Sequence, residues 1–250
     1  MKIVVIGGSG LIGKKLIPLL IEWGHDAISA SPSSGVNTLT KEGLAEVLTG
    51  VDTVVDVTNS PSFEDNAVLK FFETSTRNIL AAEAVAGVQH HVALSVVGAD
   101  CIPDSGYMRA KVSQEHLIET SGVPYTILRA TQFFEFLPTI AGPGTDTVRL
   151  PVAPIQPIAG DDVAKALAVV ALEAPKNDAI EIAGPESLSI AEFVRKALTA
   201  MGYQRNIVDD PLARYFGAAL DEFGLKPRKD NPLISSTYFD HWFDLVPVRK

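Results

Sequence analysis

Three polar side chains in the middle of the chain have the types and the spacing for acid–base chemistry. Tyr107 and Lys111 are four residues apart, so a helix would place them on one face. A free phenol has a pKa near ~10, and an adjacent ammonium group would lower it by favouring the phenolate. Ser95 ends an apolar run upstream, where its hydroxyl could hydrogen-bond a substrate oxygen. We expect these three residues to form a proton-transfer site; a surface tyrosine beside a solvated lysine is the alternative.

A glycine-rich segment near the start of the chain could hold a pyrophosphate. Residues 7–13 read GGSGLIG and follow the apolar run 3–6. The segment fits both G-x-G-x-x-G and G-x-x-G-x-x-G in the strand–turn–helix context that such motifs require. The following helix would offer free N–H groups and the positive end of its dipole. A glycine turn without a ligand is the alternative. The expected contacts are Gly7, Ser9, Gly10, Leu11, Ile12 and Gly13.

The segment after the second expected strand bears on which dinucleotide would bind. An NAD site has a carboxylate ~20 residues beyond the glycine motif, which binds the adenosine ribose. Residues 29–34 read SASPSS and contain none. Hydroxyl groups could instead donate to a 2′-phosphate, which favours NADP(H) as the cofactor and leaves NAD(H) possible, because this loop also lacks an arginine. The candidate hydroxyls are those of Ser31, Ser33 and Ser34.

A turn of sequence TNSP follows the third expected strand, at residues 58–61. The strand order of a doubly wound sheet reverses at one point. This turn and the glycine-rich turn would lie side by side there. We expect Thr58 and Asn59 to contact the cofactor there. An ordinary turn explains the same residues equally well.

Short β-branched runs alternate with longer amphipathic stretches over the first half of the chain, a pattern that is typical of βαβ units. Strands are expected near 2–6, 26–31, 53–58, 91–96 and 125–129. Helices are expected near 11–23, 40–49, 63–86 and 106–121. Because the strands are apolar on both sides, we predict an α/β fold, a Rossmann-type doubly wound parallel sheet with helices on both faces.

The second half is richer in proline and glycine, and no clean linker separates it from the first. Its expected elements are a helix at about 161–173, a strand at 179–183 and a helix from a capping box at Ser189 to about 201. We therefore expect a single dinucleotide-binding domain over 1–250. Within it, about 131–250 contributes a smaller substrate-side region at the carboxyl edge of the sheet.

Residues 131–136 read TQFFEF and follow the strand expected at 125–129. They would therefore lie near the reactive end of the cofactor. Adjacent phenylalanines cannot all face one core, so some could line a substrate wall, which would suit an apolar or aromatic substrate. Packing between the two halves of the chain explains them equally well.

The composition excludes several kinds of site and partner. With 21 Lys+Arg and 30 Asp+Glu, the formal charge of −9 disfavours broad binding to nucleic acid or to anionic membranes. The single cysteine, Cys101, excludes an internal disulfide, and His90 and His91 lack partners at metal-ligand spacing, so no metal is expected. Since no apolar run suits a signal peptide or a membrane span, we expect a cytoplasmic protein that acts on a small molecule.

The sequence resembles the short-chain dehydrogenase/reductase superfamily, in particular its atypical, NmrA-like NAD(P)-binding members. The resemblance covers most of the chain. The matching motifs are the glycine turn, TRNIL at 76–80, Ser95, Tyr107 with Lys111, TILRA at 126–130, and QPI at 156–158 running into DDVA at 161–164. Two departures are that Ala130 stands where relatives often carry proline, and that the arginine which many NADP-using relatives place after the second strand is absent.

The resemblance implies a role for each residue of the proton-transfer site. Tyr107 would donate and accept the proton, Lys111 would bind the nicotinamide ribose and tune the tyrosine, and Ser95 would orient the substrate; all three would also contact the cofactor. The implied function is an NAD(P)(H)-dependent oxidoreductase that transfers hydride between nicotinamide and a small carbonyl or alcohol. A non-catalytic NAD(P)-sensing regulator is one alternative, and an NAD-dependent epimerase or dehydratase is another.

Overall fold

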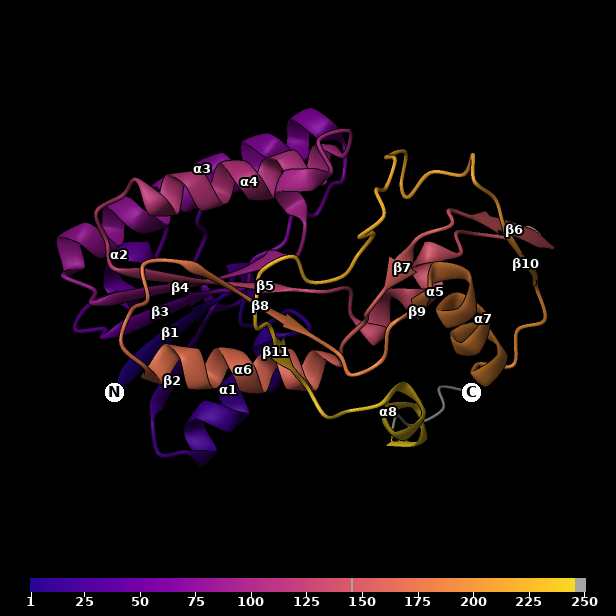
Figure 1. Cartoon of the computed structure of the whole chain (residues 1–250). Coiled ribbons are helices and arrows are strands. Elements are labelled where there is room, and N and C mark those ends of the chain that lie inside the picture. The colour runs from indigo at the N-terminus through magenta and orange to yellow at the C-terminus, as the bar shows by residue number, and fades with distance from the viewer. Residues whose placement is uncertain (145, 246–250) are drawn as a thin grey trace.

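The computed structural model describes residues 1–144 and 146–245, and a seven-stranded parallel sheet forms the centre of this part of the chain (Figure 1). In spatial order its strands are β2 (Asp26–Ala30), β1 (Lys2–Ile6), β3 (Thr53–Asp56), β4 (His90–Val96), β5 (Tyr125–Ala130), β8 (Ala179–Ala183) and β11 (Leu233–Ile234). The order reverses between β1 and β3, because the chain leaves β1 for one edge and returns on its other side. Such a reversal opens a crevice at the carboxyl ends of the strands. The Rossmann-type α/β fold is therefore confirmed.

Helices cover both faces of the sheet (Figure 1). One layer contains α1 (Gly13–Glu22) and α6 (Gly160–Leu172), and the other contains α2 (Leu44–Val47), α3 (Asp65–Ala86) and α4 (Gly106–Glu119). Along β1, Val5 packs with residues of α1 and α6, whereas Val4 packs with residues of α2 and α3. Burial on both faces explains why the strands read as continuous apolar runs.

Local signals in the sequence start and stop several helices. The Glu64 carboxylate accepts hydrogen bonds from two N–H groups in the first turn of α3, at 3.2 and 2.9 Å, and α3 ends at Gly87, whose φ is 73°. At α7 (Ile190–Ala200), the N–H of Glu192 donates to the Ser189 hydroxyl at 3.1 Å, and the N–H of Ser189 donates to the Glu192 carboxylate at 2.9 Å. The predicted capping box is therefore present.

Two elements are shorter than predicted, and the backbone explains both. The helix predicted at 40–49 is reduced to α2, because Lys41 and Gly43 have positive φ angles of 69° and 66°. The third strand ends at Asp56, whose carboxylate accepts a hydrogen bond of 2.9 Å from the N–H of Thr58 and turns the chain. The other predicted strands and helices are present to within a few residues.

A smaller region follows the carboxyl ends of β5 and β8 and lies to the right in Figure 1. It contains β6 (Thr147–Leu150) paired with β10 (Asn206–Asp209), β7 (Pro154–Ile155) paired with β9 (Leu188–Ser189), α5 (Leu137–Ile140), α7 and α8 (Phe239–Leu245). Phe134, Phe193, Phe239 and Trp242 are buried in its aromatic core. Because α6, β8 and β11 belong to the sheet layers, the chain passes between the two regions more than once.

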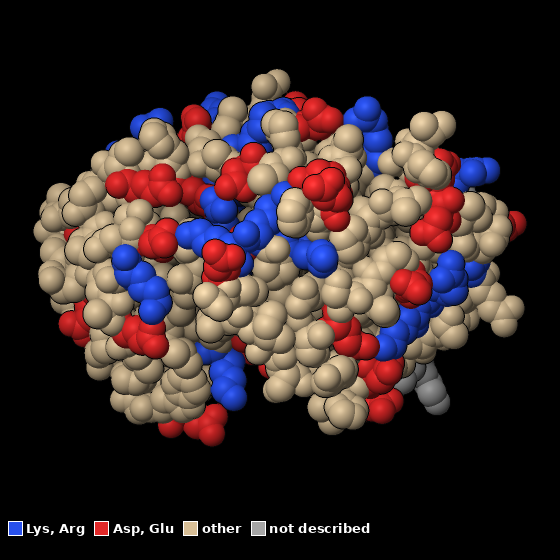
Figure 2. Space-filling model, viewed as in Figure 1, with Lys and Arg blue, Asp and Glu red and all other residues tan. Residues whose placement is uncertain are grey.

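Acidic and basic side chains alternate over the face shown in Figure 2. Ion pairs anchor the segment before β11, for example Arg228 to Asp221 and Lys229 to Asp178, each at 2.8 Å. Among residues 1–144 and 146–245, no helix combines the length and the apolarity needed to cross a bilayer.

Two buried histidines on β4 join the sheet to its surroundings. His91 Nδ1 lies 2.7 Å from the Glu83 carboxylate on α3, and His90 Nε2 lies 2.9 Å from the Thr126 hydroxyl on β5. Although burial opposes it, the Glu83 carboxylate raises the pKa of His91. Burial and the neighbouring His91 lower the pKa of His90 to about 4.

The lowered pKa of His90 predicts a loss of stability in mild acid. Between pH 6.5 and about 4 the unfolded chain binds a proton at His90 that the folded chain does not, so stability falls as the pH falls. From pH 7.5 to pH 5.0 this group should lower the free energy of unfolding by ~2 kcal/mol. Urea unfolding of the wild type and of His90→Gln at both pH values measures the effect. An equal drop in the variant would exclude His90 as its source.

Candidate active site

The glycine-rich turn brings the start of α1 against the end of β3. Gly7 has a φ of 82°, and a Cβ there would lie 2.9 Å from the carbonyl carbon and oxygen of Val57. A Cβ on Gly13 would overlap the Cα of Gly8. Glycine is therefore required at 7 and 13, because no side chain fits between these backbone segments.

The same turn presents free backbone donors. In the described part of the chain, the N–H groups of Leu11, Ile12 and Gly13 donate to no protein acceptor, and Ile12 provides no side-chain cap for α1. Such N–H groups and the positive end of the helix dipole are the usual binding site for a phosphate. The turn is thus chemically suited to the diphosphate of a dinucleotide.

The loop after β3 connects the glycine-rich turn to Tyr107. Val57 contacts Gly7, and two residues later the Asn59 amide oxygen accepts a hydrogen bond of 3.2 Å from the Tyr107 hydroxyl. The Thr58 hydroxyl is buried and has no partner among the described residues. The predicted phosphate loop and the predicted acid–base residue therefore lie at the same edge of the sheet.

Other polar atoms without partners lie at the same edge of the sheet. Alternation along β4 places Ser95 on the side of the sheet that α3 and α4 cover, where its hydroxyl is buried. Thr131 and Gln132 directly follow β5, and each also has a buried side-chain oxygen. None of these three oxygens has a hydrogen-bond partner among the described residues. Because an unpaired buried polar group costs ~1–3 kcal/mol, these atoms indicate a polar ligand or solvent at this edge.

The predicted activation of Tyr107 by Lys111 is wrong for this structure. The Tyr107 ring packs against Phe63 and Phe72, at centroid distances of 5.6 and 6.0 Å, and burial raises the pKa of Tyr107 to about 12. The expected lowering is absent because desolvation of the phenol dominates. Tyr107 is therefore protonated over the whole neutral range.

Lys111 is almost fully buried between α4 and the sheet. Its ammonium group donates to the Leu94 carbonyl at 2.9 Å and to the Gln114 amide oxygen, and it lies 4.5 Å from the centre of the Phe72 ring. The Gln114 amide nitrogen in turn donates to Asp56 at 2.9 Å. Burial lowers the pKa of Lys111 to about 8 despite the carboxylates nearby. Because Tyr107 and Lys111 share a helix face, both contact the ring of Phe72. The Lys111 side chain extends past this ring towards the sheet.

The serine-rich loop after β2 uses part of its hydrogen-bonding capacity internally. Ser34 accepts from the N–H of Ser31 at 2.9 Å and closes the short 3-10 helix Pro32–Ser34, while the Ser31 and Ser33 hydroxyls lie 2.9 Å apart. Lys15 pairs with Asp161 on α6 at 2.7 Å. The hydroxyls of Ser31 and Ser33 remain the candidates for a ribose phosphate, and the type of cofactor is not fixed by this loop.

Exposed aromatic rings lie on two segments that are distant in the sequence. Phe63 and Phe216 are exposed, and the Phe216 ring contacts the rings of Tyr215 and Phe136. Within the segment predicted to form a substrate wall, Phe134 is instead part of the buried core. The contacts of Phe63 with Tyr107 and of Phe216 with Phe136 join residues far apart in the sequence, so spacing in the chain carried no signal.

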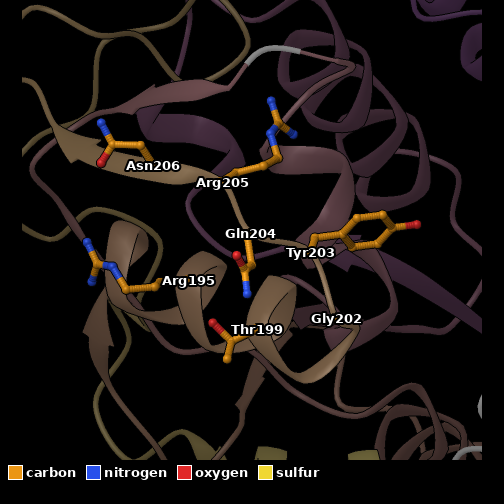
Figure 3. Close-up of a pocket in the computed structure, with 7 residues that line it drawn as sticks. All are labelled: Arg195, Thr199, Gly202, Tyr203, Gln204, Arg205 and Asn206. Atoms are coloured by element: carbon orange, nitrogen blue, oxygen red, sulfur yellow. The ribbon is translucent and has the colours of Figure 1, made fainter.

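A separate surface hollow of about 510 Å³ lies at the end of α7 (Figure 3). It is lined by Arg195, Thr199, Gly202, Tyr203, Gln204, Arg205 and Asn206. Arg195 donates to the Ile207 carbonyl at 3.1 Å, and Arg205 donates to the Gly142 carbonyl at 2.9 Å. The hollow contains none of the predicted site residues.

Residues 7–174 match the family model described as NAD(P)H-binding. Because this match covers more than half of the chain, the chain belongs to this NAD(P)H-binding family. The family assignment confirms the resemblance to the atypical short-chain dehydrogenase/reductase superfamily and shows that the chain carries a domain that binds a nicotinamide dinucleotide.

Individual relatives include reductases. The chain is 30% identical over 222 residues to an NAD(P)H azoreductase of Xenophilus azovorans. The aligned region covers 80% of this chain and 74% of that protein. It is 28% identical over 220 residues, with the same coverage, to a (4-alkanoyl-5-oxo-2,5-dihydrofuran-3-yl)methyl phosphate reductase of Streptomyces griseus. Among solved structures, a UDP-N-acetylglucosamine 4-epimerase from Bacillus cereus has a TM-score of 0.69 at 19% identity over 99% of both chains, a similarity of fold.

The close contact at Gly7 predicts a specific loss of dinucleotide binding. Gly7→Ala should weaken NADPH and NADH by at least ~10-fold, because the methyl group pushes the turn away from Val57 and displaces the N–H groups. Gly24→Ala is the matched control: its φ of 85° imposes similar backbone strain, but its Cβ would meet open space. Fluorescence titrations measure both affinities. Equal affinities in the two variants would refute a role for the contact.

Proposed function

We propose that the chain is an NAD(P)H-dependent reductase that delivers a hydride to the carbonyl carbon of a small molecule while Tyr107 supplies the proton. The hydrogen bond between Tyr107 and Asn59 carries this proposal, because the Asn59 loop also contacts the glycine-rich turn. A phosphate-binding turn and a proton donor at one edge of the sheet are what such a reaction requires. The names of the azoreductase and the phosphate reductase support a reductase.

The cofactor would be held at the reversal of strand order. The N–H groups of Leu11, Ile12 and Gly13 would bind its diphosphate, and the loop at Thr58 and Asn59 would lie beside its middle. Ser31 and Ser33 would receive the adenosine ribose, and NADP(H) is favoured since this loop has no carboxylate to repel a 2′-phosphate. When bound, the nicotinamide would supply the hydride.

A protonated Tyr107 suits the direction of reduction. With its pKa raised to about 12, the phenol holds its proton at neutral pH and can donate it to an oxygen that gains charge during hydride addition. The unpartnered Ser95 hydroxyl would donate a second hydrogen bond to the same oxygen. Lys111, through Leu94 and Gln114, would hold α4 and thereby Tyr107 against the sheet.

A dinucleotide-binding regulator without turnover is the second candidate. Two observations favour it: Lys111 is buried, and the pKa of Tyr107 is not lowered. Neither is expected where a lysine activates a neighbouring tyrosine. Loss of Tyr107 would leave such a protein's behaviour unchanged, so the experiment that follows also separates the two candidates.

Tyr107→Phe should abolish most of the turnover and leave cofactor binding intact. Removing a positioned proton donor is expected to lower kcat by ~10²–10⁴-fold, whereas the NADPH affinity should stay within ~3-fold of the wild type. NADPH oxidation with a panel of small carbonyl compounds measures kcat. Tyr125→Phe, at the amino end of β5, is the control. Full turnover in Tyr107→Phe would exclude the proposed role.

Ser33→Asp should reverse the preference for the phosphorylated cofactor. The exposed Ser33 hydroxyl can be replaced without disturbing the core, and a carboxylate there would repel a 2′-phosphate. We expect the affinity for NADPH to fall at least ~10-fold and that for NADH to change less than ~3-fold. Separate titrations with the two nucleotides measure this. A wild type that strongly prefers NADH would contradict the assignment of NADP(H).

A further inference from the structure

A strained turn presents an aromatic ring beside the candidate active site. The N–H of Tyr215 donates to the Ala218 carbonyl at 2.8 Å, and the N–H of Ala218 donates back at 3.0 Å. The two residues between them, Phe216 and Gly217, have φ angles of 47° and 85°. Positive φ at both central positions is typical of a type I′ turn, where asparagine, aspartate and glycine are preferred. Phenylalanine is an unfavourable residue at the first of these positions.

Packing explains only part of why phenylalanine occupies this position: its ring contacts those of Tyr215 and Phe136, but 56% of the Phe216 surface is exposed. A residue with a strained backbone and a large exposed apolar ring adds little to the stability of the folded state. Strained residues of this kind cluster at functional sites, so the φ angle of Phe216 indicates a function for this residue.

One ion pair joins this turn to the segment before α4. Arg214 pairs with Asp104 at 3.2 Å and donates to the Gly217 carbonyl at 3.4 Å. Asp104 directly precedes the N-cap of α4, whose first turn carries Tyr107. The buried Tyr215 ring belongs to the aromatic core against which Tyr107 packs. Burial and, after it, the nearby phenol of Tyr107 raise the pKa of Tyr215. The turn is therefore close to the proton donor.

A second exposed ring contacts Tyr107 from the segment before α3. Phe63 is 62% exposed, and its ring lies 5.6 Å from that of Tyr107 at an angle of 44°. On the other segment, the ring of Phe216 lies 4.8 Å from Tyr215 and 5.8 Å from Phe136. Phe63 thus contacts the residue whose hydroxyl would donate the proton, and Phe216 contacts Tyr215, a member of the core cluster against which Tyr107 packs.

We propose that Phe63 and Phe216 bind a flat, conjugated ring system, so that the substrates of this site are aryl or otherwise conjugated carbonyl compounds. The inference rests on the proposed reductase function. The hydride from NAD(P)H forms a bond to the carbonyl carbon, the π pair of the C=O bond moves to the oxygen, and the Tyr107 proton joins it. The products are an aryl alcohol and NAD(P)⁺. A flat ring can stack on aromatic side chains, whereas a saturated ring of the same size cannot.

Binding of a matched pair of alcohols tests the proposal without relying on turnover. Calorimetry of the NADP⁺ complex should give 2-naphthylmethanol at least ~10-fold higher affinity than decahydro-2-naphthylmethanol, a ratio consistent with the energy of aromatic contacts. In Phe216→Asn and in Phe63→Leu this ratio should fall to within ~3-fold, with the NADP⁺ affinity unchanged. Tyr203→Asn, which removes a ring that is 60% exposed at the end of α7, should keep the wild-type ratio.

The stability of Phe216→Asn provides a second readout. Asparagine suits the first position of a type I′ turn, so the variant should have a higher urea midpoint than the wild type. A lower midpoint, or an unchanged preference for the flat alcohol in both variants, would overturn the inference. Reduction of 2-naphthaldehyde by the wild type reports separately on the proposed function. A protein that prefers the flat alcohol but does not oxidise NADPH with this aldehyde would retain the ring site and lose the reductase assignment.

Discussion

The close contact between the glycine-rich turn and the end of β3 is the constraint on which the site depends. Because Gly7 carries no side chain, its Cα can approach the Val57 carbonyl, and the first turn of α1 then starts at the carboxyl ends of β1 and β3. Two residues after Val57, the Asn59 amide oxygen accepts a hydrogen bond from the Tyr107 hydroxyl. The glycine-rich turn and the Tyr107 hydroxyl, carried by distant segments, thus lie at one edge of the sheet.

Features that depend on neighbours in the chain could be predicted from the sequence. Burial on both faces of the sheet is encoded in continuous apolar strands, and the capping box at Ser189 and Glu192 is a local hydrogen-bonding pattern. The glycine-rich turn was equally readable, because its strand–turn–helix context lies within a few residues. The shortening of α2 was not, since lysine as a residue type gives no sign of the positive φ angle that Lys41 adopts.

The chemistry of the site depended on contacts that the sequence does not contain. The spacing of Tyr107 and Lys111 correctly placed both on one helix face, but the pKa of each is set by residues of other elements. Phe72, from α3, contacts both side chains. Desolvation consequently raises the pKa of the phenol, where an exposed pair would have lowered it. The exposed ring of Phe216 likewise contacts Phe136 only through the tertiary fold.

The central claim is that the phosphate-binding turn and the Tyr107 hydroxyl serve one bound dinucleotide. A crystal structure of the complex with NADP⁺ tests this most directly. It should show the diphosphate on the N–H groups of Leu11, Ile12 and Gly13, with the nicotinamide end beside the Tyr107 hydroxyl. A nucleotide bound at that turn whose nicotinamide points away from Tyr107, or a diphosphate bound elsewhere on the chain, would contradict it.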